Sequence, residues 1–149
     1  MNRAVRFHET GGPGVLRLEE VPVPAPAPGE VLIRTRALGL NRAESMFRLG
    51  QYGIDPAFPS GVGYEAAGVI EALGEGVSGL SVGEAVSVVP SFTMTDYPMH
   101  GEAVLAPVGA VVAHPQRLSF EEPRPCGCSS SPPTAAWSTS RASAPATPS

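Results

Sequence analysis

Two segments determine the architecture expected of this chain: residues 37–44, ALGLNRAE, and residues 59–70, PSGVGYEAAGVI. In the first segment Asn41 stands at a natural helix N-cap, and Glu44 follows three residues later, as in a capping box. Residues 42–49 are therefore predicted to form a short helix, which the next glycine closes in the left-handed conformation. The second segment passes from a glycine-rich turn into an apolar run, which favours a strand.

Short apolar or alternating segments, separated by glycine and proline turns, continue from this centre in both directions. A turn cluster at residues 11–14 separates the first two, which are predicted to pair as a hairpin. Residues 51–60 are predicted to be an irregular loop. Many short strands with glycine turns are typical of a β-barrel or sandwich, so the fold class is mainly β. The predicted strands cover residues 4–7, 15–21, 31–37, 68–73, 85–89, 102–106 and 110–113.

The string GEGVSG at residues 74–79 matches the dinucleotide-binding fingerprint literally. That fingerprint requires a helix immediately afterwards, to hold a pyrophosphate, and an acidic residue about 20 positions further on. Here the continuation is LSVGE, residues 80–84, which has the chemistry of a turn, and Asp96 has no predicted strand around it. We therefore predict a hairpin turn and no Rossmann domain within this chain.

The bulk composition narrows the class of protein. The chain has 149 residues, 42% of them hydrophobic, and a net charge of −4, which suits one globular domain and argues against nucleic acid as a partner. The sequence shows neither a signal peptide nor an apolar run of about 18 residues, so we expect a cytoplasmic protein without a membrane partner. Cys126 and Cys128 form a lone CxC, which is predicted to be reduced and without function.

Isolated charged and titratable side chains are predicted to lie at the surface. The histidines His8, His100 and His114 are not spaced as metal ligands are. Arg48 is expected to solvate the outer face of the predicted helix. The sequence therefore predicts no metal site.

The motifs from residue 37 to residue 70, with RLGQY at residues 48–52 between the two opening segments, resemble the medium-chain dehydrogenase/reductase superfamily. Within it the chain is similar to the zinc-free quinone oxidoreductase branch, of the zeta-crystallin type. The resemblance covers residues 1–122 and implies a GroES-like, partly open β-barrel with one or two short helices. In that family a Rossmann domain normally follows and binds NADPH in the groove between the domains, although the choice of NADPH over NADH stays open here.

The positions of the catalytic zinc ligands separate this chain from related alcohol dehydrogenases. Those enzymes place Cys where this chain has Asn41, and His where it has Tyr64. Asn cannot replace a thiolate, and a phenol is a poor zinc ligand at neutral pH. The resemblance therefore implies hydride transfer from NAD(P)H to a quinone or an enone, without zinc. A zinc-type alcohol dehydrogenase and the enoyl-reductase domain of a polyketide synthase remain minor alternatives.

By analogy with the family, four residues form the expected site. Asn41 is expected near the nicotinamide ring, as both a catalytic and a cofactor-binding residue, and Met46 beside the cofactor. Some relatives carry Tyr where this chain has Met46, so the pocket should be more apolar. Tyr52 is expected either to donate its hydroxyl hydrogen to the acceptor or to anchor a loop. Tyr64 is expected to line the substrate cleft with Tyr52.

The last residues differ from the rest. Ser119 and Glu122 have the S-x-x-E spacing that is typical of the start of a helix. Residues 123–149, however, are rich in Pro and Ser and lack the apolar periodicity of a helix. Read one base out of frame, the segment from Glu122 permits EAAAVWMQFLTAYGGLVDIAGVRPGDTV, which is helix-like at its start and similar to the family's continuation. We therefore expect a GroES-like domain over residues 1–122, a disordered out-of-frame tail over 123–149, and a chain truncated by a one-base slip.

Two functions follow as alternatives. A truncated reductase should be inactive alone, because most of its cofactor site would lie in the absent domain. A non-enzymatic GroES-like binding module is the alternative from a different class. Family members are often homodimeric, and the barrel face that a second domain would cover should be apolar and promote self-association.

Overall fold

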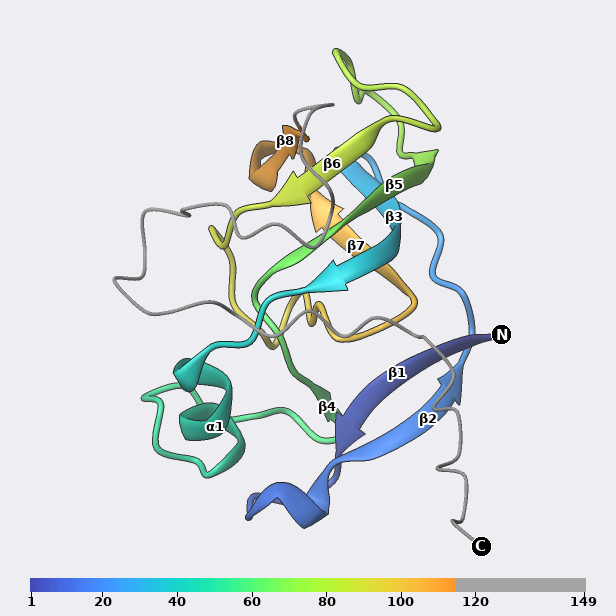
Figure 1. The fold of residues 1–149 in the computed structure, drawn as a ribbon. Coiled ribbons are helices and arrows are strands. Elements are labelled where there is room, and N and C mark those ends of the chain that lie inside the picture. Colours follow the sequence, from blue (N-terminus) through green and yellow to red (C-terminus); the bar gives the residue numbers. More distant parts are fainter. Residues whose placement is uncertain (115–149) are drawn as a thin grey trace, which may run out of the picture.

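The computed structural model describes residues 1–114, which are mainly β with one α-helix (Figure 1). Within this range the strands form a three-stranded sheet in the order β2-β1-β4 and a five-stranded sheet in the order β7-β3-β5-β6-β8, and all the pairings are antiparallel. The strands are β1 Asn2–Phe7, β2 Arg17–Val21, β3 Glu30–Leu38, β4 Ser60–Gly61, β5 Ala66–Leu73, β6 Ala85–Val88, β7 Ala103–Pro107 and β8 Val111–Ala113.

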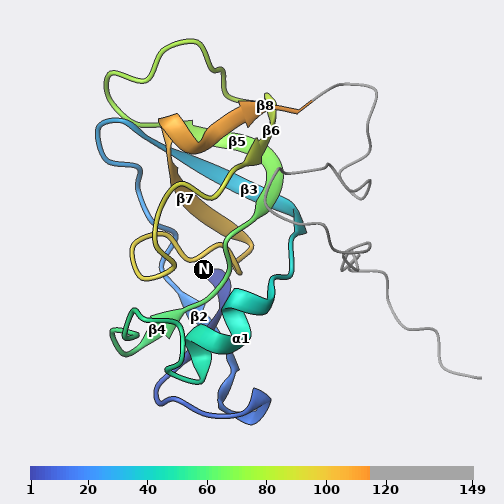
Figure 2. The same cartoon turned by 90° about the vertical axis from the view of Figure 1, so that its left-hand side faces the viewer.

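These elements confirm the predicted mainly β, GroES-like fold with one short helix. Figure 2, turned by 90° from Figure 1, shows α1 and β4 at one end of the molecule and β8 at the other. Within the described part of the chain, the structure shows no helix long and apolar enough to span a membrane. The tail at residues 123–149 and the helix start predicted at Ser119 and Glu122 lie outside the described residues.

The larger core is built around β3, the strand that pairs with both β5 and β7. Val31 and Ile33 are fully buried, because β3 is a central strand with neighbours on both edges. Ile33 lies opposite Ile70 of β5 and Val104 of β7, so three apolar side chains meet across three strands. The strand predicted at residues 31–37 is therefore an inner strand of the five-stranded sheet.

The glycine-rich string at residues 74–79 joins β5 to its antiparallel neighbour β6. Gly76 and Gly79 adopt φ values of 77° and 80°, a left-handed conformation that glycine adopts without strain. No helix follows before β6 begins at Ala85. The string is thus a turn between paired strands, which confirms the prediction against a dinucleotide-binding fingerprint.

The helix α1, Arg42–Arg48, begins and ends almost as predicted. Asn41 is its N-cap residue with extended backbone, but its side chain makes no capping hydrogen bond. At the other end Gly50 has φ 71°, its N–H donates to Phe47 O (3.0 Å), and the N–H of Gln51 donates to Met46 O (2.8 Å). These two bonds form a Schellman motif, so the glycine stops the helix as predicted.

A second, smaller core lies between α1 and β1. The rings of Phe47 and Phe7 meet edge-to-face, with centroids 5.9 Å apart, and both side chains are buried. Val62 and Met94 complete the cluster. This core holds the helix against the three-stranded sheet, because α1 is too short to be stable on its own.

Four local predictions need correction. Strand β4 begins at Ser60, the last residue of the predicted loop 51–60, and its two residues pair with the end of β1. Strands β2 and β8 begin later than predicted, because the 3-10 helices Pro13–Val15 and Val108–Ala110 precede them. Arg48 does not solvate the helix face: it is only 8% exposed, and its Nη1 donates to Gly11 O.

The two sheets are joined along β1. Asn2 Nδ2 donates to Ala103 O (2.8 Å), and the N–H of Ala103 donates back to Asn2 Oδ1 (2.9 Å). The N–H of Val5 donates to His100 O (2.8 Å). These bonds bring the segment before β7 between the sheets and place His100 near the start of α1.

Candidate functional site

The expected site residues come from α1, from the residues on either side of it, and from the turn that follows β4. Asn41 precedes α1, Met46 lies on α1, Tyr52 follows the helix, and Tyr64 lies in the turn between β4 and β5. The hydroxyl oxygens of Tyr52 and Tyr64 are 3.4 Å apart, and their ring centroids are 6.2 Å apart. Both tyrosines pack against the smaller core, so the structure brings these two predicted residues together.

Asn41 has a polar group without a partner. Its Nδ2 is buried and has no hydrogen-bond partner within residues 1–114. A buried amide donor left unpaired costs free energy, roughly 1–3 kcal/mol. The side chain does not cap the helix either, so the structure assigns this donor no partner among residues 1–114.

Tyr64 stays protonated over a wide pH range. Burial, and then the hydrogen bond to Tyr52, raise the pKa of its hydroxyl. The Tyr64 hydroxyl donates to Tyr52, which leaves the Tyr52 hydroxyl hydrogen able to donate elsewhere. The pair therefore provides a neutral hydrogen-bond donor at the edge of the smaller core.

Glu44 and His100 form a buried pair that the sequence did not indicate. Glu44 is only 7% exposed, and its Oε1 lies 3.7 Å from His100 Nε2. Burial raises the pKa of the Glu44 carboxyl, while His100 and the backbone N–H groups of Asn41 and Tyr64 act to lower it. The capping-box spacing pointed to Glu44, but no local pattern pointed to His100.

Met46 lies on the open side of α1. Its side chain is 38% exposed. Apolar side chains next to the helix and in the loop after it are at least as exposed: Leu40, Leu49, Ile54 and Phe58. Asn41 and the two tyrosines, by contrast, are half-buried.

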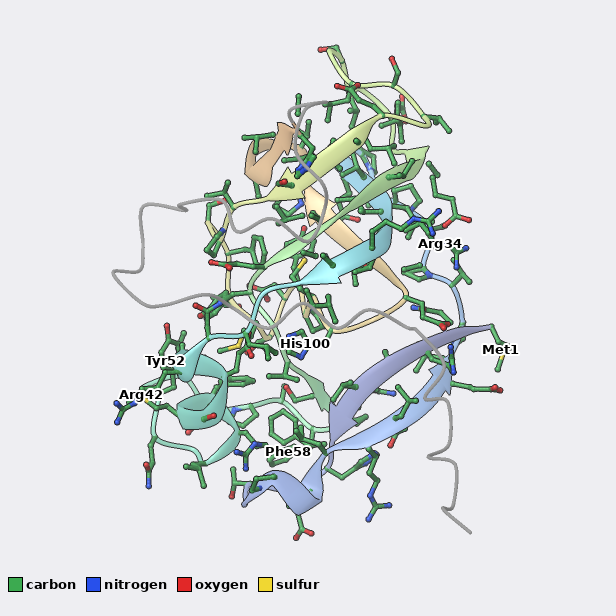
Figure 3. All side chains as sticks on the ribbon, in the orientation of Figure 1. Met1, Arg34, Arg42, Tyr52, Phe58 and His100 are labelled. Atoms are coloured by element: carbon green, nitrogen blue, oxygen red, sulfur yellow. The ribbon has the colours of Figure 1, made fainter. Side chains whose placement is uncertain are left out.

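The histidines occupy three different environments, which corrects the prediction that all are surface residues. His8 is exposed beside Glu19 (2.6 Å). His114 is buried, with Nδ1 2.8 Å from Ser87 Oγ. His100 lies toward the centre of the molecule (Figure 3). Across residues 1–114, no three His, Cys, Asp or Glu side chains gather in a way that would hold a metal ion.

A groove of about 380 Å³ lies apart from the tyrosine pair. Its walls come from β1, from residues 21–24 and 57–61, and from the segment leading into β7. Of the site residues described above, His100 alone lines it. The groove and the candidate site therefore share one side chain.

The strand order and the one α-helix of residues 1–114 fit a GroES-like domain of the medium-chain dehydrogenase/reductase superfamily, as the sequence resemblance implied. The chain belongs to the alcohol dehydrogenase GroES-like domain family, which it matches over residues 27–121.

Several known proteins are similar to this chain. Quinone oxidoreductase of Rattus norvegicus is 46% identical over 85 residues, which is 56% of this chain and 26% of that protein. The structure of human synaptic vesicle membrane protein VAT-1 homolog-like protein has a TM-score of 0.74 and 36% identity, over 82% of this chain and 38% of that one. Escherichia coli quinone oxidoreductase in complex with NADPH has a TM-score of 0.70 and 31% identity, over 81% and 35%.

The match covers only part of each relative. The chain spans between 26% and 36% of the length of the curated relatives it matches. The similarity therefore concerns one domain, and the activity of the whole relatives is not carried over with it.

Proposed function

We propose that this domain is the acceptor-binding part of an NAD(P)H-dependent reductase whose substrate is a quinone or an enone. The observation that carries the proposal is the hydroxyl pair of Tyr52 and Tyr64, which provides a neutral donor in a chain similar to quinone oxidoreductases. Solved relatives are titled as complexes with NADPH, which supports NADPH as the cofactor.

Each expected residue has a role in this proposal. Tyr52 donates a hydrogen bond to the acceptor oxygen, and Tyr64 orients the Tyr52 hydroxyl by donating to it. The unpaired Nδ2 of Asn41 suits a second hydrogen bond, either to the acceptor or to the carboxamide of the cofactor. Met46 presents an apolar wall on the cofactor side.

The chemistry divides between cofactor and protein. When bound, NADPH supplies the hydride. The residues of this domain position the acceptor and stabilise the negative charge that develops on its oxygen. We propose that no zinc takes part, since Asn41 and Tyr64 are poor zinc ligands.

Most of the cofactor site would lie outside this domain, so we propose that the 149-residue chain alone is inactive. Measurable quinone-dependent oxidation of NADPH by the purified chain would contradict this.

We also propose that the protein is cytoplasmic, and fractionation of the native host tests that location.

A non-enzymatic binding module is the second candidate. The exposed apolar side chains around α1, including Met46 and Phe58, favour self-association or a protein partner. A specific partner captured by a well-behaved monomer would support the module. Self-association would instead support a reductase domain, because its apolar face is one that a second domain would cover.

The first proposal is tested by titrating the chain with duroquinone and following the backbone amide resonances. A fully substituted quinone is chosen because it does not add to the thiols of Cys126 and Cys128. We expect shifts at Asn41, Tyr52 and Tyr64, and binding several-fold weaker in Tyr52→Phe. The matched control is Tyr97→Phe, since Tyr97 hydrogen-bonds Glu30 outside the site. Equal affinity in Tyr52→Phe and the parent chain would refute the proposed donor.

A further inference from the structure

One carboxyl group lies between the two segments that carry the candidate site. The backbone N–H groups of Asn41 and Tyr64 lie near the Glu44 carboxyl and act to lower its pKa, and the N–H of Glu44 donates to Asn41 O (3.1 Å). Asn41 belongs to the segment that enters α1, and Tyr64 to the turn that enters β5. A displacement of the Glu44 carboxylate would therefore change the distance between these two residues.

His100 lies beside this carboxyl group and belongs to a third segment. Its Nε2 lies 3.7 Å from Glu44 Oε1 and 3.3 Å from Gly39 O, and the side chains of the pair are only 10% and 9% exposed. The backbone fixes the imidazole ring in place, because the N–H of His100 donates to Val62 O (2.9 Å) and its carbonyl accepts from Val5 N–H (2.8 Å).

The residue beside Tyr64 fits this ring closely. Gly63 has φ 111°, and a Cβ atom there would lie 2.4 Å from His100 Cδ2. The ring thus packs directly on the backbone of the turn that carries Tyr64. His100 packs on this turn, and the Tyr64 N–H of the same turn lies near the Glu44 carboxyl and acts to lower its pKa.

The charges around Glu44 make the pair interdependent. Its Oε1 is buried and has no hydrogen-bond partner among residues 1–114. His100 is the nearby group whose charge favours the ionised carboxylate, and Glu65 is a like charge that opposes ionisation. A buried carboxylate without compensation is costly, so the ionised form depends on His100.

We propose that Glu44 and His100 are positioning residues of the candidate site. The Glu44 carboxyl keeps Asn41 and Tyr64 at a fixed distance from each other, and the His100 imidazole keeps this carboxyl in place. The pair acts on the acceptor only through Asn41 and Tyr64. The identity of the acceptor rests on the proposed function, whereas the positioning role does not.

The first test compares Glu44→Gln with Glu71→Gln, the same change at an exposed carboxylate that pairs with Arg34. In folded Glu44→Gln we expect the amide resonances of Asn41 and Tyr64 to move upfield, because the carboxyl group near their N–H groups is replaced by a neutral amide. Duroquinone binding should weaken roughly fivefold to tenfold, the equivalent of one hydrogen bond. Glu71→Gln should change neither quantity. Unchanged amide resonances in folded Glu44→Gln would overturn the proposal.

A second variant keeps the test valid if Glu44→Gln does not fold. His100→Gln retains an N–H donor for Gly39 O but removes the titratable charge. We expect the carboxyl of Glu44, followed by its side-chain carbon resonance, to titrate at higher pH than in the parent chain. An unchanged titration would overturn the role of His100. If the parent chain does not bind duroquinone, the proposed function fails, while the amide and carboxyl measurements still decide the positioning role.

Discussion

The Tyr64 hydroxyl donates to the Tyr52 hydroxyl across 3.4 Å, in a position that burial keeps neutral. The distance is longer than that of a strong O–H···O bond, which leaves room for the pair to tighten on an acceptor. The two residues belong to different segments, one after α1 and one before β5. Their contact gives the domain a donor that neither segment provides alone.

The alkaline titration of the tyrosines tests this contact. The pKa of Tyr64 is raised, so its contribution to stability is present below about pH 10, the ordinary pKa of tyrosine, and is lost as the pH rises through the higher folded value. We expect Tyr64 to ionise after an ordinary tyrosine in a spectroscopic titration, and Tyr64→Phe to remove that late step. The hydrogen bond to Glu30 raises the pKa of Tyr97 too, so the comparison is made in a Tyr97→Phe background. A late step that persists there after Tyr64→Phe would contradict the raised pKa of Tyr64.

The stability of the chain near Glu44 should depend on pH in a defined direction. Burial raises the pKa of Glu44 above its unfolded value, so the stabilisation is full below about pH 4 and is lost as the pH rises through the folded pKa. Urea unfolding should therefore show a larger advantage of the parent chain over Glu44→Gln in mild acid than at neutral pH. A constant difference across that range would contradict a raised pKa. Glu71→Gln serves as the exposed control.

Two asparagines should lose different amounts of stability on truncation. Asn2 exchanges two hydrogen bonds with Ala103, so Asn2→Ala should lower the free energy of unfolding by about 1–3 kcal/mol. Asn41 makes no side-chain capping bond and has an unpaired Nδ2, so Asn41→Ala should cost less than the usual cap loss of about 1 kcal/mol.

The same pair separates stability from ligand binding. Asn41→Ala should weaken duroquinone binding, and Asn2→Ala should not where both remain folded. Chemical denaturation and the amide titration measure the two effects independently. The assignment of Asn41 to the site would be wrong if its truncation affected stability alone.

The smaller core should depend on one aromatic ring more than on another. Phe47 is 1% exposed and meets Phe7 edge-to-face, so Phe47→Ala should cost about 3–5 kcal/mol. Phe58 also meets Phe7, with centroids 5.7 Å apart, but is 48% exposed, so Phe58→Ala should cost clearly less. Equal losses in thermal or urea unfolding would show that burial does not distinguish the two rings.

Much of the fold follows from local sequence. The helix over residues 42–48, its N-cap residue Asn41 and its stop at Gly50 depend on residues within a few positions of one another. The central strand and the turn at residues 74–79 were predictable for the same reason, because side-chain branching and glycine act on the backbone where they stand.

Part of the fold has no local signal. Strand β4 has only two residues, and it exists because β1 offers a free edge to pair with. The 3-10 helices before β2 and β8 shortened the predicted strands at one end. Element ends are set by tertiary hydrogen bonds as much as by residue type, so they were predicted less well than the elements themselves.

The candidate site, like the fold, was predictable from the sequence only in part. The resemblance to the family pointed to Asn41, Tyr52 and Tyr64 as site residues, and the side-chain chemistry of Asn41 and Tyr64 explains why these two are poor zinc ligands. The burial of Arg48 and the contact of His100 with Glu44 could not. Both contacts join residues far apart in the chain, and burial is a property of the packed structure, so only the folded arrangement of β1, α1 and the segment before β7 decided them.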